Sequence, residues 1–302
     1  MLKFSFIVPV YNSEIYLKEC LDSLIFFENY NSECIIINDG STDGSLNIIN
    51  AYKKKYPDFI KVYSQDNKGL SGARNHGINN SEGQYLIFVD SDDILSNSMT
   101  TIFEYLLDND IDIISYDYAI FKSDTNEIVK YKTLSTDESK PYIERAFITN
   151  VWCAPFRVYN RNVFNSQKFK KNLYYEDLEL IPKLYIESKE IRHINIVGYL
   201  YRDNSNGIMG TYNIKKIKDL KLIRKNTDSI EDCNYKFLYK LHISKLINDY
   251  ESKYQLDISK FENKINLKCI SFLSTNKLFY LISPFLYYNI TKFIRKMKKL
   301  II

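Results

Sequence analysis

Residues 83–93 read GQYLIFVDSDD, so a short apolar run ends in three carboxylates within four positions. A run of this length, followed by polar residues, is typical of a buried β-strand. Like charges at such close spacing repel one another. We therefore expect a cation, or a ligand that needs hydrogen-bond acceptors, beside Asp90, Asp92 and Asp93.

The first 120 residues alternate strand and helix patterns around this stretch. Strands are predicted at 4–10, 33–39, 60–65, 84–90 and 111–118, and helices at 13–27, 44–56, 70–79 and near 99–108. Asn12 or Ser13 is the expected cap of the first helix, and Asp43 of the second. Short apolar strands separated by single helices favour an α/β fold with a doubly wound parallel sheet.

Ligands of such sheets bind outside the carboxyl ends of the strands. Three predicted strand ends carry unusual polar sequences, namely PVYN (9–12), NDGSTDGS (38–45) and DSDD (90–93). All three should line one crevice. Residues 121–141 are polar and weakly patterned, which indicates a loop or a hairpin.

The charge is distributed unevenly along the 302 residues. Residues 1–120 hold 8 Lys or Arg against 18 Asp or Glu, a net charge of −10, and the remainder holds 33 against 19, or +14. The two parts are therefore expected to meet different partners, such as a metal and anions. The five cysteines are scattered without a C-x-x-C pair, which indicates free thiols in a reducing compartment, and we expect a cytoplasmic protein.

Each polar motif has a simple alternative when it is considered alone. DSDD can hold Mg²⁺ or Mn²⁺, or it can cap the helix that follows. NDGSTDGS begins like a calcium loop, but Asn50 stands where that loop needs a Glu. The chain has neither G-x-G-x-x-G nor a Walker A lysine motif, while Lys68 and Arg74 offer cations for a phosphate or a base carbonyl.

Four blocks in order carry a resemblance: SFIVPVYNSEIYLKECLDSL, ECIIINDGSTDGS, NKGLSGARNHGINNSEGQYLIFVDSDD and EDLEL. Together they resemble the family 2 glycosyltransferases, which are inverting enzymes that use nucleotide-sugar donors. The resemblance implies a GT-A, Rossmann-like, mostly parallel sheet with flanking helices. It implies a catalytic domain at 1–212, with a donor-binding half (about 1–120) and an acceptor-side half (about 121–212), and a basic, mainly helical region at 213–302.

The resemblance also implies roles for individual residues. Asp39 would accept a hydrogen bond from the ring N–H of uracil or a similar base, and Tyr11 would offer an aromatic face. Asp92, helped by Asp90, would hold a divalent cation, Mn²⁺ or Mg²⁺, at the diphosphate. The residues assigned to the nucleotide sugar are Pro9, Val10, Tyr11, Asn12, Asp39, Lys68, Gly69, Arg74, Asp90, Ser91, Asp92 and Arg202.

The acidic pair Glu176 and Asp177 stands just before a predicted helix. Both could simply complement the positive helix terminus, which should favour the ionised form. By resemblance, Asp177 would be the general base that removes the acceptor proton, with Glu176 as the next candidate. Arg202 is placed in a flexible loop that could close on the diphosphate. His193 is more easily explained as a hydrogen-bonded structural residue than as a ligand.

The processive members of the family carry a Q-x-x-R-W element, which this chain lacks. We therefore expect transfer of a single sugar, from a UDP-sugar or another nucleotide sugar, to a glycan or lipid-linked acceptor in cell-surface polysaccharide synthesis. The residues alone leave open a nucleotidyltransferase, or a module that binds a sugar nucleotide or an anionic surface without catalysis. The apolar and basic residues 278–302 are expected to touch an anionic membrane surface, and no nucleic acid is expected as partner.

Overall fold

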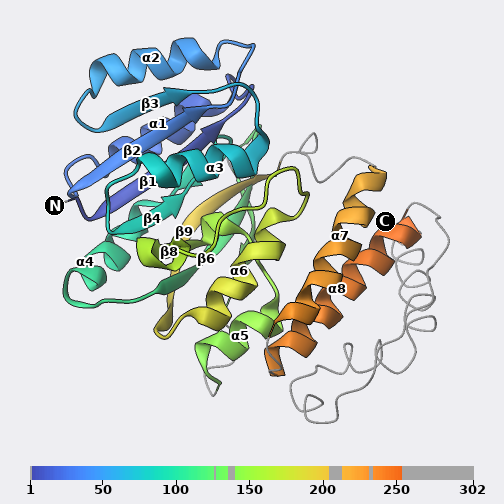
Figure 1. Ribbon diagram of the computed structural model, residues 1–302. Helices are drawn as coiled ribbons and strands as arrows, with labels where there is room; N and C mark the ends of the chain where they lie inside the picture. The colour runs from blue at the N-terminus through green and yellow to red at the C-terminus, as the bar shows by residue number, and fades with distance from the viewer. Residues whose placement is uncertain (1, 126, 135–139, 204–212, 231–233, 254–302) are drawn as a thin grey trace. The chain divides into compact units, whose positions relative to one another are not determined.

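The computed structural model describes residues 2–125, 127–134, 140–203, 213–230 and 234–253 (Figure 1). The chain divides into two compact units, Met1–Thr211 and Tyr212–Ile302. The division of the first unit into donor and acceptor halves is a functional assignment that stays a prediction. Residues 278–302, expected at a membrane surface, lie outside the described residues.

Strands and helices of the first unit follow one another in nearly regular alternation. The strands are β1 (Phe4–Val10), β2 (Ser32–Asn38), β3 (Ile60–Ser64), β4 (Tyr85–Phe88), β5 (Ile94–Leu95), β6 (Ile113–Lys122), β7 (Ile128–Lys132), β8 (Arg157–Asn160) and β9 (Ile191–Asp203). The helices are α1 (Leu17–Ile25), α2 (Ser45–Lys55), α3 (Gly69–Asn80), α4 (Thr100–Asp108), α5 (Tyr142–Thr149) and α6 (Glu176–Glu187).

One mixed sheet joins the described strands in the order β3-β2-β1-β4-β8-β6-β9-β5, with β7 paired to β6. β1 pairs in parallel with β2 and β4, and β2 pairs in parallel with β3, as the sequence predicts. β8 lies between β4 and β6 and runs antiparallel to both. The α/β fold with a mostly parallel sheet is thus confirmed. The predicted strand at 111–118 corresponds to β6, which runs in the same direction as β4, and the antiparallel β8 between them was not predicted.

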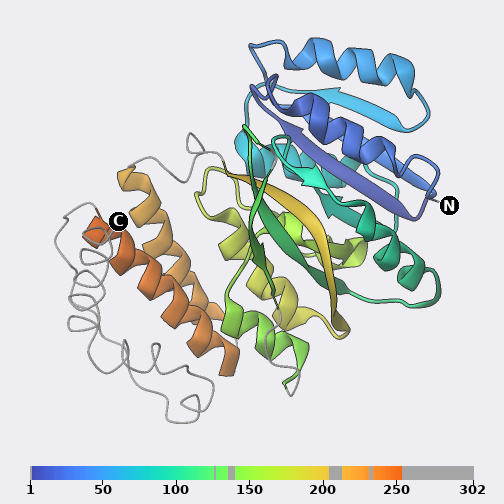
Figure 2. The ribbon, with the colours of Figure 1, turned by 180° about the vertical axis from the view of Figure 1, so that it is seen from behind.

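Helices cover both faces of the parallel part of the sheet. On one face, Phe6 and Val8 of β1 belong to a core cluster with Leu21 of α1 and Phe103 of α4. On the other face, α3 packs so closely that a Cβ atom at Gly77 would lie 2.3 Å from a methyl carbon of Ile7. Figure 1 shows α3 and α6 on the same side of the sheet, and Figure 2 shows the face covered by α1 and α4.

The first helix begins later than expected, at Leu17. Neither Asn12 nor Ser13 caps it, because Asn12 adopts a left-handed conformation and accepts hydrogen bonds from Thr42 instead. The Ser13 hydroxyl lies 2.7 Å from that of Ser91. Asp43 is the predicted cap of α2; the N-cap residue is instead Gly44, and Asp43, one position earlier, accepts the N–H of Ser45 at 3.0 Å. The connection from β1 to α1 is therefore held by the loops that contain Thr42 and Ser91, and not by a side-chain cap on α1.

The polar residues after 120 form the predicted hairpin, in which β6 pairs antiparallel with β7. In the second unit, α7 (Ile214–Asn226) and α8 (Asn234–Lys253) are helices. Lys221 of α7 forms an ion pair with the buried Glu251 of α8. None of the helices in the described part of the chain is long and apolar enough to span a membrane.

Candidate active site

Loops after three parallel strands meet at the carboxyl edge of the sheet, as the sequence predicts. Asn12, after β1, accepts the backbone N–H of Thr42, after β2, at 2.8 Å. Ser13 contacts Ser91, after β4, through the hydroxyl pair described above. The backbone N–H of Asp39 donates to the carbonyl of Val10 at 2.8 Å. The polar sequences after β1, β2 and β4 therefore line one site.

Asp39 lies at the base of this site and is 3% exposed. Its Oδ1 atom accepts hydrogen bonds from Gln65 Nε2 at 2.7 Å and from the backbone N–H of Lys68 at 2.8 Å. Gly69 begins α3 with a φ of +71°, a conformation that glycine adopts without strain. Both hydrogen bonds use Oδ1, so Oδ2 is the oxygen through which Asp39 could accept a further donor.

The residues assigned to the nucleotide differ in their exposure. Pro9 and Val10 are buried within β1, whereas Tyr11 is 50% exposed and Lys68 is exposed. Tyr11 is therefore the aromatic face that this turn presents to solvent. Ser91 is buried through its contact with Ser13.

The three aspartates after β4 have different environments. Asp93 is buried and accepts hydrogen bonds from the hydroxyl of Tyr199 and the backbone N–H of Arg202, at 2.9 and 2.7 Å. Burial raises the pKa of Asp93 well above its usual value, and the nearby charges of Asp92 and Asp90 raise it further. Asp90 and Asp92 are each partly exposed. Asp93 thus has a structural position, and the other two face the site.

Arg74 is the central cation of the site. Its side chain is 1% exposed, yet it contacts three carboxylates that come from two distant parts of the sequence. Nη2 lies 2.9 Å from Oδ1 of Asp90, and Nη1 lies 3.1 Å from Oε1 of Glu176 and 2.7 Å from Oδ1 of Asp177. The guanidinium group also lies over the rings of Phe88 and Phe169. A buried cation with three acidic partners fixes their relative positions.

Glu176 and Asp177 form the first turn of α6, which begins at Glu176 and not after Asp177 as predicted. The residue before them, Tyr175, has a left-handed conformation with a φ of 61°, which is unusual for a bulky side chain. Asp177 Oδ2 accepts the backbone N–H of Ala154 at 3.0 Å, and Oδ1 contacts Arg74. Both oxygens of Asp177 therefore have fixed partners. Its side chain is nevertheless 18% exposed to solvent.

Burial has a strong effect on the protonation of this acidic pair. It raises the pKa of Glu176 to about 7, with the charge of Asp177 as the next cause and the charge of Arg74 opposing both. Burial also raises the pKa of Asp177, against the charge of Arg74 and the N–H of Ala154. The shift of Asp177 is opposite to the effect expected from a helix N-terminus. The pair holds a proton more tightly than two exposed carboxylates would.

The placement of Arg202 in a flexible loop is wrong, because β9 continues through Asp203 and pairs with β6. Arg202 is 2% exposed; its Nε atom donates to the carbonyl of Asp92 at 2.6 Å, and its guanidinium pairs with Glu19. Its side chain thus supports the backbone of the DSDD turn. The rest of the predicted loop, within the stretch YLYRDNSNGIMG (199–210), lies outside the described residues from position 204 onward.

Asp90 and Asp92 are the residues that could hold a metal. The described residues contain no group of three His, Cys, Asp or Glu side chains arranged for a metal ion. Mg²⁺ commonly needs only one or two protein carboxylates, because substrate phosphates and water complete its shell. The partly exposed Asp92, next to Asp90 at the strand end, fits that kind of site.

Sequence reasoning missed Tyr199, whose hydroxyl accepts the N–H of Asp90 at 3.0 Å and donates to Asp93. Tyr199 lies in an apolar strand, where nothing in the pattern separates it from a core residue. His193 is the structural residue that was expected, since its Nδ1 lies 3.0 Å from the Ser115 hydroxyl and its Nε2 lies 3.2 Å from Asp117.

Several known proteins are similar to this chain in sequence or in fold. GlyA, a glycosyltransferase of Streptococcus pneumoniae, is 32% identical over 212 residues, which cover 66% of this chain and 30% of GlyA. The chain thus spans less than a third of GlyA. Residues 1–349 of S. aureus TarS, in complex with UDP-GlcNAc, have a TM-score of 0.63 at 20% identity, over 90% of this chain and 80% of that fragment. Mannosyltransferase PcManGT from Pyrobaculum calidifontis, with GDP-Man and Mn²⁺, has a TM-score of 0.59 at 15% identity, over 96% of this chain and 83% of that one.

These likenesses of fold agree with the GT-A architecture that the sequence blocks imply. The family model described as glycosyl transferase family 2 matches residues 5–167, more than half of the chain. This range includes the loops after β1, β2 and β4, together with Arg74. The chain belongs to glycosyl transferase family 2.

Proposed function

We propose that this chain transfers one sugar from a nucleotide sugar, most simply a UDP-sugar, to a hydroxyl of a glycan or lipid-linked acceptor, with inversion at the anomeric carbon. The observation that carries the proposal is the contact of Arg74 with both Asp90 and Asp177. Through this contact, Arg74 links Asp90, which lies beside the donor loops, to Asp177, which is the proposed base. UDP-GlcNAc in TarS supports the assignment of the donor class.

Asp39 would select the base of the donor. Its Oδ2 would accept the ring N–H of uracil, while Oδ1 is held by Gln65 and the backbone of Lys68. The half-exposed ring of Tyr11 would lie against the same base. The exposed ammonium group of Lys68 would approach the phosphates.

Asp177 would take the proton of the acceptor hydroxyl. The hydroxyl oxygen would then form a bond to the anomeric carbon from the face opposite the nucleotide, and the bond from that carbon to the diphosphate would break. Arg74 and the N–H of Ala154 each bind one oxygen of Asp177. The orientation of the carboxylate is therefore fixed before the acceptor binds. A proton acceptor of this kind typically contributes about 10²–10⁴-fold to the rate.

Asp92, with help from Asp90, would hold the divalent cation. Such a cation would supply charge neutralisation at the departing diphosphate, which removes the need to protonate the leaving group. The Mn²⁺ in PcManGT supports this assignment. The role of Asp90 is shared, because its Oδ1 atom also contacts Arg74.

The test combines donor binding with transfer. Purified full-length protein is screened against a panel of nucleotide sugars with Mn²⁺ by thermal shift, and the stabilising donor is then used in single-turnover transfer to matched acceptors. Asp177→Asn keeps the size of the side chain but cannot take a proton, and its single amide oxygen can accept from only one of the two donors, Arg74 and the N–H of Ala154. We expect its transfer rate to fall by about 10²–10⁴-fold with donor affinity nearly unchanged. A near-normal rate would move the base elsewhere, with Glu176 as the first alternative.

A further inference from the structure

The segment 151–155 leads from α5 to β8 and has little regular backbone hydrogen bonding of its own. Four of its carbonyl groups accept hydrogen bonds from side chains. Arg157 donates to the carbonyls of Val151 and Cys153 at 2.5 and 2.7 Å. The hydroxyls of Tyr159 and Tyr116 donate to Ala154 and Pro155 at 3.2 and 2.5 Å. The segment is therefore fixed by side chains from the sheet.

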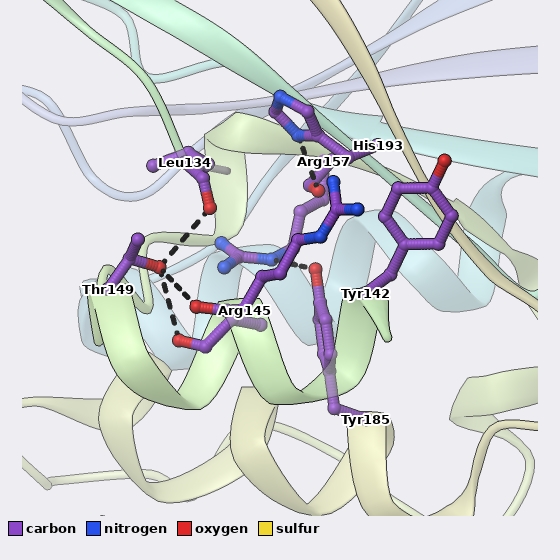
Figure 3. A pocket seen from close by; sticks show the side chains of 9 residues that line it. Leu134, Tyr142, Arg145, Thr149, Arg157, Tyr185 and His193 are labelled. Carbon is purple, nitrogen blue, oxygen red and sulfur yellow. Dashed lines mark hydrogen bonds between the residues drawn. The ribbon is translucent and has the colours of Figure 1, made fainter. Parts of the chain in front are cut away.

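Arg157 is the unusual member of this set. It is 2% exposed, and within the described part of the chain no carboxylate lies within ion-pair distance of it. Its Nε atom donates to the hydroxyl of Tyr185 at 2.8 Å, a contact visible in Figure 3. The guanidinium group also lies over the rings of Tyr185 and Trp152. A buried cation with neutral partners is costly, so a simpler polar residue would be expected if only the carbonyl groups needed donors.

The contacts of Arg157 join the two elements that hold Asp177. Ala154, in the fixed segment, donates its N–H to Asp177 Oδ2. Tyr185 lies on α6, the helix whose first turn carries Asp177. One planar guanidinium group therefore sets the distance between the Ala154 N–H donor and the helix that presents the carboxylate.

We propose that Arg157 is a positioning residue for Asp177, acting through the 151–155 segment and α6. The inference rests on the proposed function, in which Asp177 is the base. Arg157 itself would not touch the donor or the acceptor. Its planar group addresses three acceptors at once through Nε, Nη1 and Nη2, whereas a lysine ammonium could replace the charge but not this geometry.

A double-mutant cycle tests the inference with Arg157→Lys, Asp177→Asn and the double variant. If Arg157 acts through Asp177, Arg157→Lys should lower the single-turnover rate by about 10-fold in the native background and by less than about twofold in Asp177→Asn. Affinity for UDP, measured by calorimetry, should change by less than about twofold, because Arg157 is not placed at the donor.

Arg161→Lys is a matched control. Arg161 also donates to neutral acceptors, the carbonyls of Gly83 and Ile78 and the hydroxyl of Ser81, at 2.9–3.1 Å. Its substitution should lower thermal stability without a comparable loss of transfer rate per folded molecule. Should Arg157→Lys fail to fold, Tyr185→Phe removes the acceptor of Nε and keeps the ring. We expect it to reduce the rate by about threefold, again only when Asp177 is present.

The outcomes separate the two proposals. Equal rate losses from Arg157→Lys in both backgrounds, or a loss of stability with an unchanged rate of the folded fraction, would overturn the positioning role alone. A rate loss in Arg161→Lys as large as that in Arg157→Lys would also overturn it. A near-normal rate for Asp177→Asn by itself would overturn the proposed base, and the inference about Arg157 with it.

Discussion

Nη1 of Arg74 lies 2.7 Å from Oδ1 of Asp177, although the two residues are 103 positions apart in the sequence. Nη2 of the same guanidinium group contacts Asp90. Arg74 was expected near the base or the phosphates of the donor. Its burial and its carboxylate partners instead support a role in setting the geometry between the donor side and the proposed base.

The first prediction concerns Arg74→Lys. The variant keeps the positive charge, but an ammonium group cannot reproduce the bonds that the planar fork makes to Asp90 and Asp177 together. We expect kcat/KM to fall by about 10–100-fold and the free energy of unfolding to fall by roughly 1–3 kcal/mol. Steady-state kinetics and urea denaturation measure both. Arg192→Lys, at a half-exposed arginine paired with Glu190, is the control and should change neither.

The second prediction concerns Asp92→Ala. The side chain is partly exposed, so its removal should leave the fold intact while it abolishes the Mn²⁺-dependent part of the stabilisation by UDP. A ligand at 100 times its Kd adds about 2.7 kcal/mol, which a thermal-shift assay resolves easily. Asp58→Ala, at an exposed aspartate outside the site, should behave like the native chain. Full retention of metal-dependent UDP binding by Asp92→Ala would refute the assignment.

The third prediction concerns Asp39→Asn. The amide oxygen can still accept from Gln65 and Lys68, which places the amide N–H₂ where Asp39 Oδ2 now lies. A donor would then face the ring N–H of uracil, so affinity for UDP should fall by about 10–100-fold. Calorimetry with UDP measures this effect, and thermal denaturation without ligand should show little change. Unchanged UDP affinity would place the base elsewhere in the site.

Much of the fold follows from the sequence because β1, β2 and β4 are short, mostly apolar and buried along their whole length. β8 could not be predicted from the sequence. Two of its four residues, Arg157 and Asn160, are polar, and their burial depends on partners elsewhere in the chain. Arg202 illustrates the same difficulty. The sequence YLYRDNSNG resembles the start of a loop, but pairing with β6 and the contact with Asp93 extend the strand through it.

The carboxylates of the site could be identified from their motifs, but their pairing could not. Nothing in the sequence distinguishes Asp93, which is buried beneath Tyr199, from Asp90 and Asp92, which face the site. Likewise, a carboxylate at a helix N-terminus is expected to stay ionised only where it is solvated, and Asp177 is only 18% exposed. Burial instead raises the pKa of Asp177 and the charge of Arg74 opposes this rise, and both effects arise from the tertiary structure.

The last prediction concerns pH and the stability of the Glu176 variant. Burial raises the pKa of Glu176 from an ordinary value of 4.5 to about 7. Between these values the folded chain binds more protons at this group than the unfolded chain does. The free energy of unfolding should therefore fall as the pH rises from about 5 to 8. The buried neighbour Asp177, whose pKa is also raised, acts in the same direction.

Glu176→Gln removes the ionisable group and keeps an oxygen that can still accept from Arg74. We expect it to flatten the pH dependence and to raise the free energy of unfolding at pH 8 by on the order of 1–3 kcal/mol, with little change at pH 5. Urea denaturation at several pH values measures both effects. Glu187→Gln, at the exposed far end of α6, should retain the native pH dependence. An unchanged slope in Glu176→Gln would mean that another group holds the proton, and Asp177→Asn in the same assay would then identify it.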